Sequence, residues 1–143
     1  MKLGILGGTF DPVHFGHLLM AEQCREQCEL DEIWFLLTGS PPHKQGVQIT
    51  DGDTRAEMIE LAIAGHPAFS VCRREIGQQG ITYTYDTLGK LYDEDPHREL
   101  YFLIGADSLA DLPNWRKPAR IAELATIVAV NRGDRPLPSL EPL

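Results

Sequence analysis

The chain has 143 residues and carries 21 acidic against 13 basic side chains, a formal net charge of −8. This length fits one domain, and the acidic balance argues against binding of a nucleic-acid polymer, because such surfaces are rich in Lys and Arg. No stretch is long and apolar enough to cross a bilayer, and no signal peptide is recognisable, so we expect no membrane contact and a cytoplasmic location. The sequence leaves the oligomeric state open.

Short apolar runs alternate with segments of helical periodicity along the chain. In chain order the pattern predicts a strand over 2–6, a helix over 15–28, a strand over 33–37, a helix over 54–64, a strand over 69–73, a helix over 84–93, a strand over 100–104, a short helix from 118 and a strand over 125–130. This alternation predicts an α/β domain with an open parallel sheet and flanking helices, over residues 1–132. Residues 133–143 are expected to form an irregular tail.

Local signals suggest where three of these helices begin. Thr54 with Glu57 fits a capping box, Thr84 is placed to cap the next helix, and Pro118 fits a first helical turn. In the first helix, Cys24 and Cys28 share one face. They are either half of a metal site or two small buried residues, and burial is favoured because no His-rich segment accompanies them.

The turn between the first strand and the first helix carries the clearest functional signal. Its glycines, Gly7 and Gly8, let the backbone approach a ligand, and a helix N-terminus offers N–H groups and positive charge to a phosphate. His14 and His17 are three residues apart and point to one side, where they can stabilise charge that develops at a transferred phosphorus. The alternatives are a helix-capping His14 with a surface His17, or a zinc site, which lacks further ligands. A dehydrogenase is disfavoured because G-x-G-x-x-G is not present.

The segment Gly-Gly-Thr-Phe-Asp-Pro-Val-His-Phe-Gly-His at residues 7–17 resembles the signature of the HIGH-type nucleotidyltransferase superfamily. Four further segments resemble bacterial nicotinate-nucleotide adenylyltransferases, in the same order along the chain: Pro41-Pro42-His43-Lys44, Thr82-Tyr83-Thr84-Tyr85-Asp86-Thr87-Leu88, Ile104-Gly105-Ala106-Asp107-Ser108 and Leu112-Pro113-Asn114-Trp115. Without the resemblance, Lys44 reads as a solvated lysine, Thr84 as a helix cap and Asp107 as an N-cap of the following helix.

The resemblance implies a Rossmann-like fold and adenylyl transfer from ATP to nicotinate mononucleotide, giving deamido-NAD and pyrophosphate, with Mg²⁺ accompanying ATP. It implies His14, His17 and Lys44 as catalytic residues. It implies ATP contacts by Gly7, Gly8, Thr9, Phe10, His14, His17, Gly105 and Asp107, and mononucleotide contacts by Lys44, Tyr83, Thr84 and Trp115.

One element of the family's pattern has no counterpart in this sequence. The family continues to an I-S-S/T-T-x-I-R motif that binds the ATP phosphates, and the 143 residues contain no such motif. We therefore expect the C-terminal part of the fold to be missing and the grip on ATP to be weak. Two alternatives stay open: a truncated, non-catalytic mononucleotide-binding fragment, and another adenylyltransferase such as the pantetheine-phosphate enzyme.

Overall fold

The computed structural model describes residues 1–38, 50–76 and 83–130. Its centre is a five-stranded sheet in the order β3-β2-β1-β4-β5, in which every neighbouring pair is parallel. The strands are β1 (Lys2–Gly8), β2 (Glu32–Leu37), β3 (Phe69–Cys72), β4 (Glu99–Gly105) and β5 (Thr126–Val130). All five predicted strands are confirmed, and the predicted open parallel α/β sheet with them.

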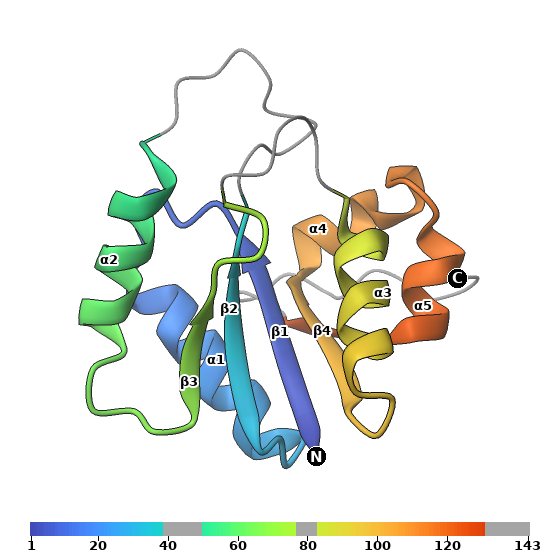
Figure 1. Cartoon of the computed structure of the whole chain (residues 1–143), viewed down its shortest axis with the longest axis horizontal. Helices are drawn as coiled ribbons and strands as arrows, with labels where there is room; N and C mark the ends of the chain where they lie inside the picture. Colours follow the sequence, from blue (N-terminus) through green and yellow to red (C-terminus); the bar gives the residue numbers. More distant parts are fainter. Residues whose placement is uncertain (39–49, 77–82, 131–143) are drawn as a thin grey trace.

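Helices cover both faces of the sheet, as Figure 1 shows, with α1 and α2 on one side and α3, α4 and α5 on the other. They are α1 (Phe15–Gln27), α2 (Gly52–Ala62), α3 (Thr84–Glu94), α4 (Ala106–Asp111) and α5 (Pro118–Leu124), with the 3-10 turn η2 (Leu112–Asn114) between the last two. Within the described ranges, none of these helices has the length and apolar character needed to traverse a bilayer.

The core lies in two layers because the central strands are apolar on both faces. Side chains alternate along a strand, so Ile5 of β1 packs toward α3 and α5 while its neighbour Leu6 packs toward α1 and α2. In β4, Phe102 and Leu103 divide between the layers in the same way. Strands that are covered on both faces read as continuous apolar runs, which is why the sequence alone predicts them.

The strand order changes direction between β1 and β4. From β1 the chain moves outward to β2 and β3, then returns through α3 to β4 on the other side of β1. Loops that leave the carboxyl ends of β1 and β4 therefore diverge onto opposite faces and leave a crevice between them, which is where ligands bind to open α/β sheets.

Three capping interpretations from the sequence are wrong. The N-cap of α2 is Asp51, whose carboxylate accepts the backbone N–H of Asp53 at 3.1 Å, while Thr54 lies within the first turn. The N-cap of α3 is Tyr83, with no side-chain cap, so Thr84 is the first helical residue. The N-cap of α4 is Gly105, which rules out Asp107 in that position. Asp51 and Thr54 are neighbouring polar residues that can both cap a helix, whereas α3 and α4 begin after residues that make no side-chain cap bond.

Candidate functional site

A pocket of about 800 Å³ occupies the crevice at the carboxyl ends of β1 and β4. Its walls come from the turn after β1, the first turns of α1 and α3, the end of β4 and the segment that follows α4. The predicted site residues that line it are Gly7, Gly8, Thr9, His17, Tyr83, Thr84, Gly105 and Trp115. Gly7 and Tyr83 are 76 positions apart in the sequence and line the same cavity. The resemblance implies such a shared cavity, because the site must bind two substrates.

Four predicted residues stand apart from that list. Phe10 and His14 do not line the pocket. Lys44 lies outside the described residues. Asp107 is the second residue of α4, directly after a glycine of the pocket wall, and its side chain is outside the described part of the structure.

The two histidines cap α1 reciprocally. Nδ1 of His14 accepts the backbone N–H of Gly16 at 3.1 Å, and Nδ1 of His17 accepts the backbone N–H of His14 at 3.1 Å. The rings stack, with centroids 3.8 Å apart. A nitrogen that accepts a hydrogen bond carries no hydrogen, so the ring hydrogen of each histidine lies on Nε2. Capping and phosphate binding are therefore compatible, because they use opposite edges of each ring.

Phe10 does not line the cavity but packs between the His17 ring and β2. It is 3 % exposed and adopts a left-handed backbone conformation with φ of 48°. Its ring meets the His17 ring edge-on at 4.9 Å and packs against Phe35 of β2 at 5.7 Å. A phenylalanine in this region is strained by about 1–2 kcal/mol, which the buried contacts offset. Phe10 thus fixes the imidazole of His17 at the edge of the pocket.

Arg55 is a supporting residue that the sequence analysis missed. It is 3 % exposed, and its guanidinium donates to the carbonyl oxygens of Thr9 at 3.0 Å, Thr38 at 2.7 Å and Thr50 at 2.6 Å. These bonds tie the turn after β1 to the end of β2 and to the start of α2. An arginine in a helix normally reads as a solvated side chain, so no local signal in the sequence indicated this role.

The far wall of the pocket is aromatic and cationic. Trp115 packs against Phe102 of β4 in a T-shaped arrangement with centroids 5.9 Å apart. The Trp115 side chain also lines the cavity. The Arg116 guanidinium lies 4.6 Å from the centroid of the Tyr83 ring. Glu75, which also lines the pocket, is 4 % exposed, and its carboxylate accepts the Thr87 hydroxyl at 2.8 Å. The wall thus combines a stacking surface with a cation.

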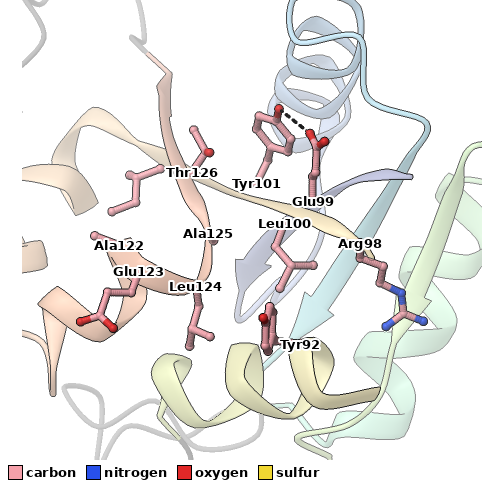
Figure 2. A pocket seen from close by; sticks show the side chains of 11 residues that line it. Tyr92, Arg98, Glu99, Leu100, Tyr101, Ala122, Glu123, Leu124, Ala125 and Thr126 are labelled. Atoms are coloured by element: carbon pink, nitrogen blue, oxygen red, sulfur yellow. Dashed lines mark hydrogen bonds between the residues drawn. The ribbon is translucent and has the colours of Figure 1, made fainter. Parts of the chain in front are cut away.

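A second hollow, of about 530 Å³, lies at the amino ends of β4 and β5. Figure 2 shows its lining, with Leu100 and Leu124 at its base and Tyr92 and Arg98 on one side. It contains none of the predicted site residues. We regard the crevice between β1 and β4 as the functional site, because the motif residues and the strand topology both point there.

Among residues 1–38, 50–76 and 83–130, no group of three or more His, Cys, Asp or Glu side chains gathers as a metal site. Cys24 is 4 % exposed and packs in the layer beneath α1, and burial raises the pKa of its thiol to about 11. A thiol in that environment is poorly suited to bind metal, since the thiolate is the ligand. The expected burial is therefore confirmed for Cys24, whereas Cys28 is only partly buried.

The strand order, the crevice at its reversal point and the glycine turn beside a capped helix N-terminus are typical of nucleotide-binding α/β proteins. The model of the cytidylyltransferase-like family matches residues 5–142. The chain is 49 % identical over 131 residues to a probable nicotinate-nucleotide adenylyltransferase of Geobacillus kaustophilus, covering 92 % of this chain and 61 % of the relative. A relative of the same name in Oceanobacillus iheyensis is 47 % identical, with 92 % of this chain and 68 % of the relative covered.

Solved structures agree on the fold. A nicotinic acid mononucleotide adenylyltransferase of Plasmodium falciparum, complexed with APC, superposes with a TM-score of 0.74 at 20 % identity, covering 93 % of this chain and 65 % of that one. A Vibrio parahaemolyticus protein superposes with a TM-score of 0.77 at 21 % identity, covering 92 % and 74 %. The chain belongs to the cytidylyltransferase-like family and, within it, to the nicotinate-nucleotide adenylyltransferases. It spans about three-fifths of the length of the Geobacillus relative.

Proposed function

We propose that this chain carries the site for adenylyl transfer from ATP to nicotinate mononucleotide, with deamido-NAD and pyrophosphate as products. The observation that carries the proposal is one cavity of about 800 Å³ that joins the glycine turn and His17 on one wall to Tyr83, Thr84 and Trp115 on the other. A cavity of this size holds ligands larger than a single ring system. The relatives' shared name supplies the substrates.

The chemistry asks little of a general base. The attacking group is a phosphate monoester, which is mostly dianionic at neutral pH because its second pKa is about 6. Catalysis then consists of in-line positioning of that phosphate against the α-phosphorus of ATP and stabilisation of the charge on the transferred group. The attacking oxygen forms a bond to the α-phosphorus, and the bond to the leaving pyrophosphate breaks.

The wall formed by β1 and α1 supports the ATP side of this reaction. We assign to His17 the donation of its Nε2 hydrogen to a phosphate oxygen, with the backbone of Gly8 and Thr9 beside it. His14 acts with His17 in the proposal, and its Nε2 is also the edge of the ring that carries a hydrogen. Lys44 is retained as a phosphate-binding cation from the resemblance, and Gly105 and Asp107 as contacts to the adenosine.

The opposite wall supports the mononucleotide side. Trp115 is partly buried, packs against Phe102 in a T-shaped arrangement and lines the pocket, where it offers a pyridine ring a surface for stacking. Tyr83 and Thr84 form the start of α3, whose N–H groups and positive end favour a carboxylate over a carboxamide. The start of α3 is the feature that favours nicotinate mononucleotide over the nicotinamide form, while stacking on Trp115 holds either pyridine ring.

A divalent ion, expected to be Mg²⁺, accompanies ATP in this proposal. Mg²⁺ keeps several waters and binds substrate phosphates with one or two protein oxygens. An ion carried on the ATP phosphates needs no dedicated set of protein ligands, so no protein ligands are assigned to it. The residues assigned above bind the phosphates rather than the ion.

The test is a coupled assay that detects deamido-NAD when the purified chain is given ATP, Mg²⁺ and either mononucleotide. We expect turnover with nicotinate mononucleotide, and at least a tenfold lower kcat/KM with nicotinamide mononucleotide. Binding of the mononucleotide without turnover would instead support a non-catalytic fragment. Turnover with phosphopantetheine in its place would move the chain to the pantetheine-phosphate group.

A further inference from the structure

We infer that Arg116 determines the preference for an acidic pyridine substrate, by placing its guanidinium against the carboxylate that the nicotinate ring carries. The inference rests on the proposed function and adds a side-chain determinant to it. In this acidic protein, Arg116 differs in its partners from every other described arginine.

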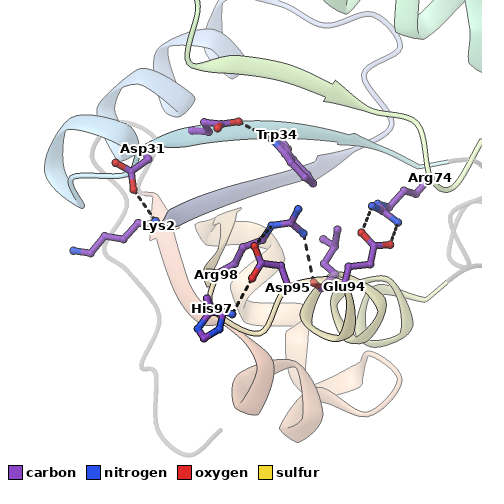
Figure 3. Close-up of polar contacts among 10 residues, drawn as sticks. Lys2, Asp31, Trp34, Arg74, Glu94, Asp95, His97 and Arg98 are labelled. Carbon is purple, nitrogen blue, oxygen red and sulfur yellow. Dashed lines mark hydrogen bonds and ion pairs between the residues drawn. The ribbon is translucent and has the colours of Figure 1, made fainter.

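The other described arginines all have oxygen partners. Arg25, Arg73, Arg74, Arg98 and Arg120 each lie within 4.0 Å of a carboxylate, and Arg55 donates to three backbone carbonyls. Figure 3 shows two of these pairs, Arg74 with Glu94 and Arg98 with Asp95. Among the described residues, no carboxylate or carbonyl oxygen pairs with Arg116. The chain contains 21 acidic residues that could pair with an arginine. An arginine that lines the pocket and pairs with none of the described ones indicates a binding site for an anionic ligand.

The position of Arg116 matches the expected position of the substrate's carboxylate. Arg116 follows Trp115 directly, and its guanidinium lies over the Tyr83 ring at the N-cap of α3, 4.6 Å from the ring centroid. A pyridine ring stacked on Trp115 carries its carboxylate only one bond from the ring. The guanidinium and the first N–H groups of α3 therefore converge on the same end of the pocket, and a planar fork of N–H donors matches a carboxylate.

The aromatic contact holds the guanidinium without neutralising it. A cation over a tyrosine face is weakly attracted to the ring at an exposed site, which restrains the side chain but leaves its N–H edges for an anion. The neighbouring Lys117 repeats the pattern, with Nζ 4.8 Å from the Tyr85 centroid. The two tyrosines stack with centroids 6.1 Å apart. The residues that line the pocket thus include two cations, Arg116 and Lys117, each held against a tyrosine ring, and one nearly buried acidic residue, Glu75.

The test compares the full chain with Arg116→Gln, Arg116→Lys and the control Arg120→Gln. Arg120 is an exposed arginine of α5 that pairs with Glu123 and does not line the pocket. Calorimetric titration with nicotinate mononucleotide and, separately, nicotinamide mononucleotide measures binding without requiring turnover. We expect Arg116→Gln to weaken binding of the acid about 10- to 100-fold and to change binding of the amide less than about threefold, since one charge-assisted contact is lost.

Arg116→Lys should keep most of the acid preference, and Arg120→Gln should behave as the unmodified chain. Raising the salt concentration should weaken binding of the acid to the unmodified chain more than to Arg116→Gln, because the contact is solvent-exposed. Equal losses for acid and amide, or no loss with Arg116→Gln, would overturn the inference while leaving the proposed function standing. If the unmodified chain binds neither mononucleotide, the proposed function fails and this inference fails with it.

Discussion

The Nδ1 atom of His17 accepts the backbone N–H of His14 at 3.1 Å, and this bond completes a reciprocal cap of α1. It also determines the tautomer, because the ring hydrogen of His17 must lie on Nε2. One side chain thus closes the helix terminus with one nitrogen and presents a donor with the other. The bond makes it possible to separate a structural from a catalytic role by substitution.

We predict that His17→Asn folds with nearly unchanged stability but loses activity about 10²–10³-fold, as for removal of one preorganised donor. The asparagine oxygen can occupy the place of Nδ1, whereas nothing replaces Nε2. His17→Ala should lose the cap as well and cost a further 0.5–2 kcal/mol or so in unfolding free energy. Denaturant unfolding and the deamido-NAD assay on both variants decide the matter. An active His17→Asn would leave His17 with capping as its only role.

Arg55→Met should destabilise the chain by about 2–4 kcal/mol, because carbonyl oxygens of Thr9, Thr38 and Thr50 lose their buried donor. The turn after β1 should also move, so the KM for ATP should rise more than the KM for the mononucleotide. Arg73→Met is the matched control, since Arg73 is exposed and pairs with Glu60 on the surface, and it should change stability far less than Arg55→Met. Equal effects of the two substitutions on stability would contradict the assigned role.

Glu29→Gly should stabilise the chain by about 0.5–1 kcal/mol. Glu29 follows α1 in a left-handed conformation with φ of 54°, and two backbone bonds close the helix around it, from Leu30 to Arg25 and from Glu29 to Glu26. A glycine adopts this conformation without the steric cost of a Cβ atom. Glu29→Ala keeps the Cβ and should gain nothing. Thermal unfolding of the two variants beside the unmodified chain measures the difference, and an equal gain from alanine would refute the explanation.

Thiol labelling should distinguish the cysteines of α1. At pH 8, with a pKa of about 11, only roughly one Cys24 thiol in a thousand is ionised, and the side chain is buried as well. Iodoacetamide followed by mass spectrometry should therefore modify the half-buried Cys28 first, and Cys24 and Cys72 only after denaturant is added. Cys28→Ser should remove the fast phase. Rapid labelling of Cys24 in the folded chain would show that the layer beneath α1 opens readily.

Asp51 should contribute stability that acid removes. The Thr54 hydroxyl and then the Asp53 amide bond its carboxylate and lower the pKa of Asp51. A lowered folded pKa gives a contribution that is fully present above the unfolded value of about 3.9 and is lost as the pH falls through the folded value. Asp51→Asn can still cap α2 but does not titrate. Its deficit in unfolding free energy should be visible at pH 7 and shrink as the pH falls below the unfolded value of about 3.9 and through the lowered folded value; a deficit that is constant with pH would contradict this.

The sequence by itself determined the elements and their class. Apolar runs such as 33–37 and 100–104 and the helical spacing within 15–28 are local signals, and the structure confirms the strands and helices they predicted within about two residues. The signature at 7–17 is contiguous, so its resemblance to nucleotidyltransferases needed no spatial information, and the family comparison confirms it. The first residue of a helix was predicted less well, because nearby residues such as Asp51 and Thr54 can both cap a helix.

Only the tertiary structure decided which residues meet. Arg55 reaches Thr9 across 46 residues of chain, and Arg116 lies over Tyr83; neither pairing has a local sequence signal. Side chains come together at the pocket because β4 inserts beside β1 rather than beside β3, which brings the end of β4 and the start of α3 to the turn after β1. Strand order is set by the burial of both faces of the whole sheet at once, a global balance that no single segment encodes.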